Sequence, residues 1–506
     1  MTLAQSLAYV LIGYAAVVLA FLHIPWLQKV IIFLHTFEFI EFRDLKQPEQ
    51  FGLERARSRS LRLTTADDIS LGAWHLLPSN CPLGQQHDGY SSGGSVGSVG
   101  SVDRDDSAAV ITSTITSNCS DVSGNSNGNN NSSNTRSNTS NNSSSKDRLF
   151  EDALRRADVA VLYLHGQFGN RGKSSRLNMY HAIQKHLPSA HILVLDYRGF
   201  ADSDGSPYED GLILDALAGW KYLRQFLPAH RIIVQGHSLG SGVAVKMTRT
   251  LNDVELFEKI INSSGAQENS KNAIRSFISE QPAAVVLEAP YAAISDLICT
   301  FRRFPLLLPL TLLPPLEQYA RARLIHRFES RIHISRVTAP VLIVHGKKDG
   351  VIPITHSEVL FTTAAAAAGA SQSATLLSGL NSSLSKLSNL SVNNNHSGEH
   401  HQQRSRPRSS KSRSGTRTPP PQLSRTQSTP ILSAASSYSG GANTPRLSGL
   451  PTETVSFADE GILLKRGKVW FMSLQHATHD DCPRFWLMGH LIHEFYEAHI
   501  GTRTPS

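Results

Sequence analysis

Gly236-His237-Ser238-Leu239-Gly240 stands between an apolar, β-branched run, Arg231–Gln235, and a segment of small, helix-compatible residues, Ser241–Met247. A Gly-x-Ser-x-Gly motif between a strand and a helix forms a sharp, strained turn, whose two glycines omit side chains that would collide with neighbouring backbone. The turn lifts the serine hydroxyl clear of the sheet, at a helix N-terminus whose free N–H groups favour developing negative charge. The motif in this context predicts an α/β sheet with Ser238 as a catalytic nucleophile.

A nucleophilic serine needs a base, and the base needs an acid that fixes its tautomer. In this architecture both follow the serine in the chain, the acid first. Pro340–Gly346 is typical of a buried strand, and Lys347–Pro353 of the turn after it. Asp349 would therefore lie at the carboxyl end of a strand, where α/β sheets place their chemistry. We predict Asp349 as the acid; the alternative is a turn aspartate that caps the next helix.

The base is expected in the loop after the last strand, Lys468–Leu474. Two histidines, His476 and His479, lie in this loop, and only one can be the base. His479 is followed by two aspartates, as in the His-x-Asp sequences that often close such sites. We favour His479, and His476 remains the alternative.

A further apolar run, Val159–Leu164, is typical of a strand buried on both faces, and the glycine-containing loop His165–Gly172 follows it. The glycines allow backbone to approach a substrate carbonyl. The backbone N–H groups of Gln167 and Leu239 are therefore predicted to form the oxyanion hole. A simple glycine-rich turn is the alternative. Asp196 and Arg198 follow the next strand and are expected to brace loops.

The apolar runs alternate with helical patterns, which predicts a mostly parallel sheet with helices on both faces. An antiparallel hairpin, Arg59–Thr64 with Ile69–Leu77, is expected at its edge. The predicted strands are 159–164, 191–195, 231–235, 283–288, 340–345 and 468–474. The predicted helices include Arg176–His186, Gly211–Phe226, Leu239–Leu251 and Phe485–His499.

Together these blocks resemble the membrane-bound α/β-hydrolase-domain lipases, most closely the branch that hydrolyses monoacylglycerols and lysophosphatidylserine. The resemblance rests on His165-Gly166, Asn170–Gly172, Asp196–Gly199, Gly236–Ala244, Leu287–Pro290, His345-Gly346 with Asp349, and the early segment Ile69–His75. It implies an α/β-hydrolase fold, with Ser238, Asp349 and His479 as nucleophile, acid and base. It also implies a fatty-acyl ester as substrate and a single-pass protein of the endoplasmic reticulum membrane. The residues around the base match the family only loosely.

The N-terminal segment Leu3–Leu22 contains no charged residue, and twenty such residues as a helix span about 30 Å, the thickness of a hydrocarbon core. The absence of a basic residue before it favours an uncleaved anchor over a cleaved signal peptide. The stretch Val30–Phe42 is expected to lie in the membrane interface. Basic residues downstream of the span predict a cytosolic catalytic domain, whereas the resemblance implies a lumenal or extracellular one.

Low-complexity composition divides the rest of the chain. The predicted organisation is an anchor and interfacial segment at 1–42, the start of the hydrolase domain at 43–83 and a disordered insert at 84–148. The hydrolase core at 149–365, a disordered Ser/Arg/Pro-rich insert at 366–455 and the end of the hydrolase domain at 456–506 follow. A shorter polar insert is expected from Ser263 to Ser279.

The formal net charge of the chain is +8, yet residues 401–450 alone hold eight Lys or Arg and no Asp or Glu. The remainder is therefore nearly neutral, and the chain carries no recognition motif for nucleic acid. A phosphorylation-dependent partner could bind the 401–450 insert. The four cysteines have neither zinc-site nor disulfide-framework spacing, and the predicted chemistry needs no metal or organic cofactor.

The sequence predicts a serine carboxylic-ester hydrolase whose substrate is a single-chain lipid ester, a monoacylglycerol or a lysophospholipid. The leucine-rich segment Phe304–Leu316 falls where lids are inserted, and could line an acyl channel, face the bilayer or pack in the core. Two other functions remain open: a thioesterase of palmitoylated protein, and a non-catalytic membrane scaffold on a hydrolase fold.

Overall fold

The computed structural model describes residues 2–35, 43–82, 145–297 with the backbone of 298–300, 309, 312–370, 452–457 and 459–501. Within these ranges the strands form one ten-stranded sheet in the order β1-β2-β4-β3-β5-β6-β7-β10-β9-β8. The strands are β1 (Ser58–Thr64), β2 (Ser70–Leu76), β3 (Val159–Leu164), β4 (Ala190–Leu195), β5 (Ile232–His237), β6 (Ala284–Glu288), β7 (Val341–Gly346), β8 (Glu453–Phe457), β9 (Gly461–Arg466) and β10 (Val469–Leu474).

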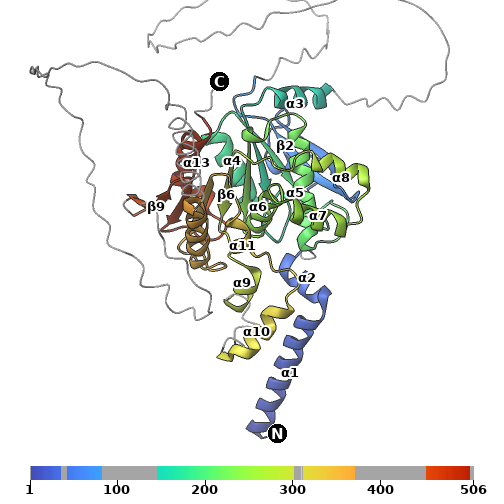
Figure 1. The fold of residues 1–506 in the computed structure, drawn as a ribbon, viewed down its shortest axis with the longest axis vertical. Helices are drawn as coiled ribbons and strands as arrows, with labels where there is room; N and C mark the ends of the chain where they lie inside the picture. The colour runs from blue at the N-terminus through green and yellow to red at the C-terminus, as the bar shows by residue number, and fades with distance from the viewer. Residues whose placement is uncertain are drawn as a thin grey trace, which may run out of the picture. The chain divides into compact units, whose positions relative to one another are not determined.

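The helices of the described residues include an N-terminal pair, those that cover the sheet, and a group between β6 and β7 (Figure 1). They are α1 (Leu3–His23), α2 (Pro25–Phe33), α3 (Ser145–Arg155), α4 (Ser174–His186), α5 (Glu209–Arg224), α6 (Leu239–Thr250), α7 (Val254–Ser263), α8 (Glu268–Arg275), α9 (Ile294–Thr300), α10 (Pro314–Arg323), α11 (Ser330–Ile334), a helix over 355–370, and α13 (Trp486–His499).

The centre of the sheet is parallel, from β4 through β3, β5, β6 and β7 to β10. Successive residues of a strand point to opposite faces, so Leu162 packs in one core layer and Val161 in the other. Helices α5 and α6 cover the first face, and α4 and α13 cover the second. The predicted fold, a mostly parallel sheet with helices on both faces, is confirmed, and the hairpin β1–β2 is antiparallel at its edge.

The sequence missed a second antiparallel hairpin, β8–β9, which extends the other edge of the sheet beyond β10. Its strands are only partly buried, so they lack the continuous apolar runs of the central strands. The predicted bounds of the two long inserts, 84–148 and 366–455, are also wrong by a few residues. Residues 366–370 are helical, 453–455 belong to β8, and 145–148 belong to α3. The remainder of each insert lies outside the described residues.

The predicted polar insert from Ser263 to Ser279 is also wrong, because this segment contains helix α8. The Arg275 guanidinium pairs with Glu258 of α7 at 2.7 Å and with Glu268 at 2.5 Å, and Ile274 is buried against the core. Polar composition concealed an amphipathic helix with a single buried apolar anchor.

The prediction of an interfacial segment at Val30–Phe42 is wrong for its first residues. Helix α2 ends at Phe33, and Ile32 and Phe33 are buried in the same core layer as α5 and α6. Residues 36–42 lie outside the described residues. Helix α1, by contrast, is long and apolar enough to cross a membrane, by length and composition.

Candidate active site

Ser238 occupies the turn between β5 and α6 with φ 51° and ψ −118°. A positive φ at a non-glycine residue is strained, and such strain persists only where the surroundings enforce it. Here the Ser238 N–H donates to the carbonyl oxygen of Glu288 at 2.9 Å, which ties the turn to the end of β6. A Cβ on Gly240 would lie 2.0 Å from the Leu164 carbonyl oxygen, so the helix meets β3 at a distance only glycine permits.

A Gly240→Ala variant should lose about 3 kcal/mol of folding stability, because the collision involves backbone atoms that no side-chain rotation can relieve. Thermal unfolding of the purified protein measures the loss. Gly369→Ala is the matched control: its added Cβ meets nothing within 4 Å, and alanine favours the surrounding helix. Equal melting temperatures for the two variants would contradict the packing argument.

The structure brings the three predicted catalytic side chains together at the carboxyl ends of β5, β7 and β10. The Ser238 Oγ lies 2.9 Å from His479 Nε2, and His479 Nδ1 lies 2.7 Å from Asp349 Oδ2. His476, the alternative base, is exposed three residues earlier in the same loop. The arrangement provides a hydroxyl, a base within hydrogen-bond reach of it and a carboxylate that orients the base.

Asp349 is held by four donors. Its Oδ1 accepts the N–H groups of Val351 at 2.7 Å and Ile352 at 2.8 Å, while its Oδ2 faces His479 and His345. Burial alone would raise the pKa of Asp349, but the hydrogen bonds and charges of the two imidazoles outweigh burial and hold the pKa well below its usual range. The carboxylate therefore stays ionised at neutral pH.

His345, which belongs to the motif around Asp349, has a role in the site that the sequence did not indicate. It is fully buried, with Nε2 3.2 Å from Asp349 Oδ2 and 2.9 Å from the Ile352 carbonyl oxygen. Its Nδ1 lies 2.6 Å from Ser357 Oγ, and a serine hydroxyl donating there fixes the tautomer that directs N–H toward Asp349. A histidine at the end of an apolar strand, four residues before the acid, was the available signal.

Leu239 directly follows the nucleophile in the chain, and Gln167 follows Gly166, which lies beside it. A Cβ on Gly166 would lie 3.1 Å from the Ser238 Cβ, so the loop runs beside the serine. Leu239 is the first residue of α6, where backbone N–H groups have no partner within the helix. Among the described residues, the N–H groups of Gln167 and Leu239 donate no hydrogen bond within the protein, so both are available to a substrate oxygen.

Arg176, also missed from sequence, orients this loop. Its guanidinium is buried and donates to the carbonyl oxygens of Gly166 and Phe168, each at 2.8 Å, and to that of Asn170. In a trans peptide the N–H points opposite to the C=O. Since the Gly166 carbonyl points to Arg176, the Gln167 N–H of the same peptide points away from it.

The loop that carries His479 is fixed on both sides of the base. His237 Nε2 lies 3.0 Å from the His479 carbonyl oxygen, and Lys173 pairs with Asp480 at 3.1 Å. Burial and the neighbouring His479 lower the pKa of His237 to about 3, so its neutral ring donates to that carbonyl. Burial, with Asp480 and Asp481 nearby, raises the pKa of Glu288 to about 8, which keeps this carboxyl uncharged behind the nucleophile at neutral pH.

Asp196 and Arg198 brace loops, as expected. Asp196 accepts from the buried Arg171 guanidinium at 2.5 Å, and Arg198 pairs with Asp215 at 2.8 Å and Asp67 at 2.7 Å. Within the described residues, no group of three or more His, Cys, Asp or Glu side chains is arranged to hold a metal ion.

The fold and this geometry define the class of protein. A family model described as the alpha/beta hydrolase fold matches residues 159–275, which include the Ser238 turn and the Gln167 loop. The chain therefore contains an α/β-hydrolase fold, as its motifs predict.

Particular relatives carry the name of the branch that the motifs resemble. The chain is 24% identical over 345 residues to Lysophosphatidylserine lipase ABHD12 of Danio rerio. This match covers 67% of each of the two chains. It is 24% identical over 348 residues to the protein of that name from Mus musculus, covering 67% of this chain and 64% of the relative. It is 27% identical over 220 residues to Protein ABHD12B of Homo sapiens, covering 42% and 52%. The match thus spans about two thirds of the lipases' length.

Proposed function

We propose that this protein is a serine hydrolase that cleaves the acyl ester of a single-chain lipid through an acyl-enzyme. The observation that carries the proposal is the continuous hydrogen-bonded series from Ser238 Oγ through His479 to the ionised Asp349. The available N–H groups of Gln167 and Leu239 beside the serine support the same chemistry.

In the proposed reaction, Ser238 Oγ attacks the ester carbonyl carbon while His479 Nε2 accepts the hydroxyl proton. The N–H groups of Gln167 and Leu239 stabilise the oxyanion, each by about 3 kcal/mol in comparable enzymes. The carbon–oxygen bond to the alcohol breaks as His479 returns the proton to that oxygen. Water, deprotonated by His479, then attacks the acyl-enzyme and releases the fatty acid and free Ser238.

The proposed substrate is a monoacylglycerol or a lysophospholipid of the lysophosphatidylserine type. The names of the relatives support a lipid ester, and the apolar helix α1 supports a protein that meets its substrate at a membrane. We propose α1 as a single-pass anchor, with the endoplasmic reticulum as the expected membrane.

A comparison of three substrates tests the proposal. Membranes containing the full-length protein should hydrolyse lysophosphatidylserine or a monoacylglycerol well above membranes containing the Ser238→Ala variant. An S-palmitoylated peptide should be hydrolysed poorly. Hydrolysis of the S-acyl peptide without hydrolysis of either lipid would contradict the proposed substrate and favour the thioesterase, while leaving the serine mechanism intact.

A further inference from the structure

Helix α10, in the segment between β6 and β7, is joined to the N-terminal helices by a buried glutamine. The Gln28 side chain is fully buried and donates to the carbonyl oxygens of Leu22 at 3.1 Å and Arg323 at 3.0 Å. Its Oε1 accepts the N–H of Ile325 at 3.0 Å. One amide therefore holds the end of α1 against the end of α10.

Side-chain packing extends this contact along both helices. Val18, Phe21 and Leu22 of α1 form a separate apolar cluster with Ala320 and Leu324 of α10. His23 Nε2 lies 2.7 Å from the Tyr319 hydroxyl. Figure 1 shows α10 beside the part of α1 that adjoins the hydrolase core.

These contacts give the direction of α10 relative to α1. Gln28 of α2 holds the C-terminal end of α10, at Arg323, beside the junction of α1 and α2, and in Figure 1 α10 runs from there away from the hydrolase core, on the side of the N-terminal part of α1. The N-terminal end of α10 therefore extends toward the apolar body of α1. At 1.5 Å per residue, position 316 lies about 5 Å from position 319 along the axis of α10, and Leu313 and Leu312 lie farther along the chain in the same direction.

The side chains at that end of α10 are apolar and exposed. Leu312 is 80% exposed, Leu313 56% and Leu316 44%, so core packing, one of the roles predicted for the leucine-rich segment, is wrong for these three. Of the residues just before Leu312, the segments 301–308 and 310–311 lie outside the described residues. Neighbouring exposed leucines, here Leu316 on α10 and Leu312 and Leu313 just before it, are typical of a surface that meets a partner or a membrane.

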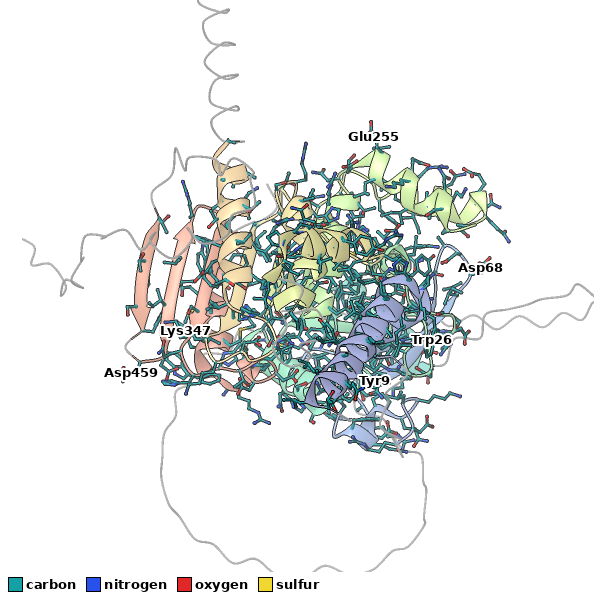
Figure 2. All side chains as sticks on the ribbon, turned by 90° about the horizontal axis from the view of Figure 1, so that it is seen from below. Tyr9, Trp26, Asp68, Glu255, Lys347 and Asp459 are labelled. Carbon is teal, nitrogen blue, oxygen red and sulfur yellow. The ribbon has the colours of Figure 1, made fainter. Side chains whose placement is uncertain are left out.

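The residues at the level of His23 are those that favour a membrane–water interface. Trp26 is 65% exposed, Tyr319 is 39% exposed, and the Arg323 guanidinium lies 5.2 Å from the Tyr319 ring centroid. Tyrosine, tryptophan and basic side chains concentrate at the headgroup level of bilayers. Figure 2 views this side of the molecule, with Tyr9 labelled on α1 and Trp26 at the start of α2.

We propose that Leu312, Leu313 and Leu316 form a second membrane-inserted surface, immersed in the same leaflet as the C-terminal turns of α1. The occupant is the bilayer itself, because this surface continues the exposed apolar face of α1 past the band of Trp26, Tyr319 and Arg323. A surface that extends about 5 Å or slightly more past Tyr319 along α10 suits the shallow insertion, about 5–10 Å, of interfacial helices. The segment between β6 and β7 would then be fixed to the membrane. This segment begins at the carboxyl end of β6, where Glu288 contacts Ser238. The inference rests on the proposed anchoring of α1.

Site-specific fluorescence tests this inference without measuring hydrolysis. Single cysteines replace Leu313, Leu316, Val10 or Ile332 in the full-length chain, in which Cys81, Cys119 and Cys299 are serine and the fully buried Cys482 is retained. Each is labelled with an environment-sensitive dye, and the protein is reconstituted in phosphatidylcholine vesicles. Val10 reports on α1, and Ile332, 53% exposed on α11, is the control in water.

Labels at positions 313, 316 and 10 should shift to shorter emission wavelengths and lose emission to nitroxide-bearing lipids, while resisting aqueous iodide. The label at position 332 should behave in the opposite way. If position 10 is embedded while 313 and 316 are quenched by iodide like 332, the inference is overturned and the anchor stands. If position 10 is also open to iodide, the anchor and the inference both fail, whatever the outcome of the hydrolysis assays.

Discussion

A Ser238→Ala variant should lose all labelling by a fluorophosphonate probe, and its lipid-ester hydrolysis should fall by about 10⁶-fold in kcat. The physical reason is that the Ser238 Oγ, at 2.9 Å from His479 Nε2, is the atom placed to lose its proton to the base and form the acyl ester. Gel-based probe labelling and fatty-acid release from the same membranes measure the two losses.

The matched control is Ser276→Ala. Ser276 is exposed just after α8 and takes no part in the series formed by Ser238, His479 and Asp349, so this variant should label and hydrolyse normally. Labelling that persists in Ser238→Ala would mean that another residue is the nucleophile. A folded wild-type protein that neither labels nor hydrolyses any ester would instead favour the non-catalytic scaffold.

A His479→Ala variant should also lose activity by about 10⁶-fold, because Ser238 then lacks a group that can accept its proton. Asp349→Asn should cost about 10⁴-fold, since the amide no longer fixes the tautomer of the base. His476→Ala is the matched control in the same loop and should retain nearly normal turnover, because its side chain is exposed.

Turnover and thermal unfolding measured together distinguish loss of the base from loss of folding. Near-normal turnover in His479→Ala, combined with inactivity in His476→Ala, would reverse the assignment of the base. The proposals for Ser238 and Asp349 would then stand on their own measurements.

The local sequence was sufficient for the central sheet and the serine turn. Strands β3, β5 and β7 are buried on both faces, so each appears as a continuous apolar run within one or two residues of its observed bounds. The turn at Ser238 is recognisable from its own motif, although only Gly236 is required by a contact within the motif, with Gly240, whereas Gly240 is required by the close approach of β3. Helices α5 and α6 also agree with their predicted ranges to within two residues, because their helical pattern is contained in the local sequence.

Elements whose stability comes from distant partners were missed or misjudged. Helix α8 depends on Arg275 reaching Glu258 in α7, and β8–β9 depends on pairing with β10. Phe33 lies in the stretch predicted for the membrane interface, yet as the last residue of α2 it packs in the protein core. Composition alone gives no sign of such contacts, because polar or mixed segments become ordered only when a particular neighbour accepts them.

The sequence by itself determined the fold class, the central strands and the three residue types of the candidate site. Only the tertiary structure decided which histidine lies at Ser238, because His476 and His479 share one loop and differ only in how that loop folds back over the sheet. The same holds for Arg176, which aims the Gln167 peptide, and for His345, which contacts Asp349 from behind. Strand runs and turns arise from neighbours in the chain, whereas the direction of a side chain or a peptide is set by groups that the sequence does not place beside it.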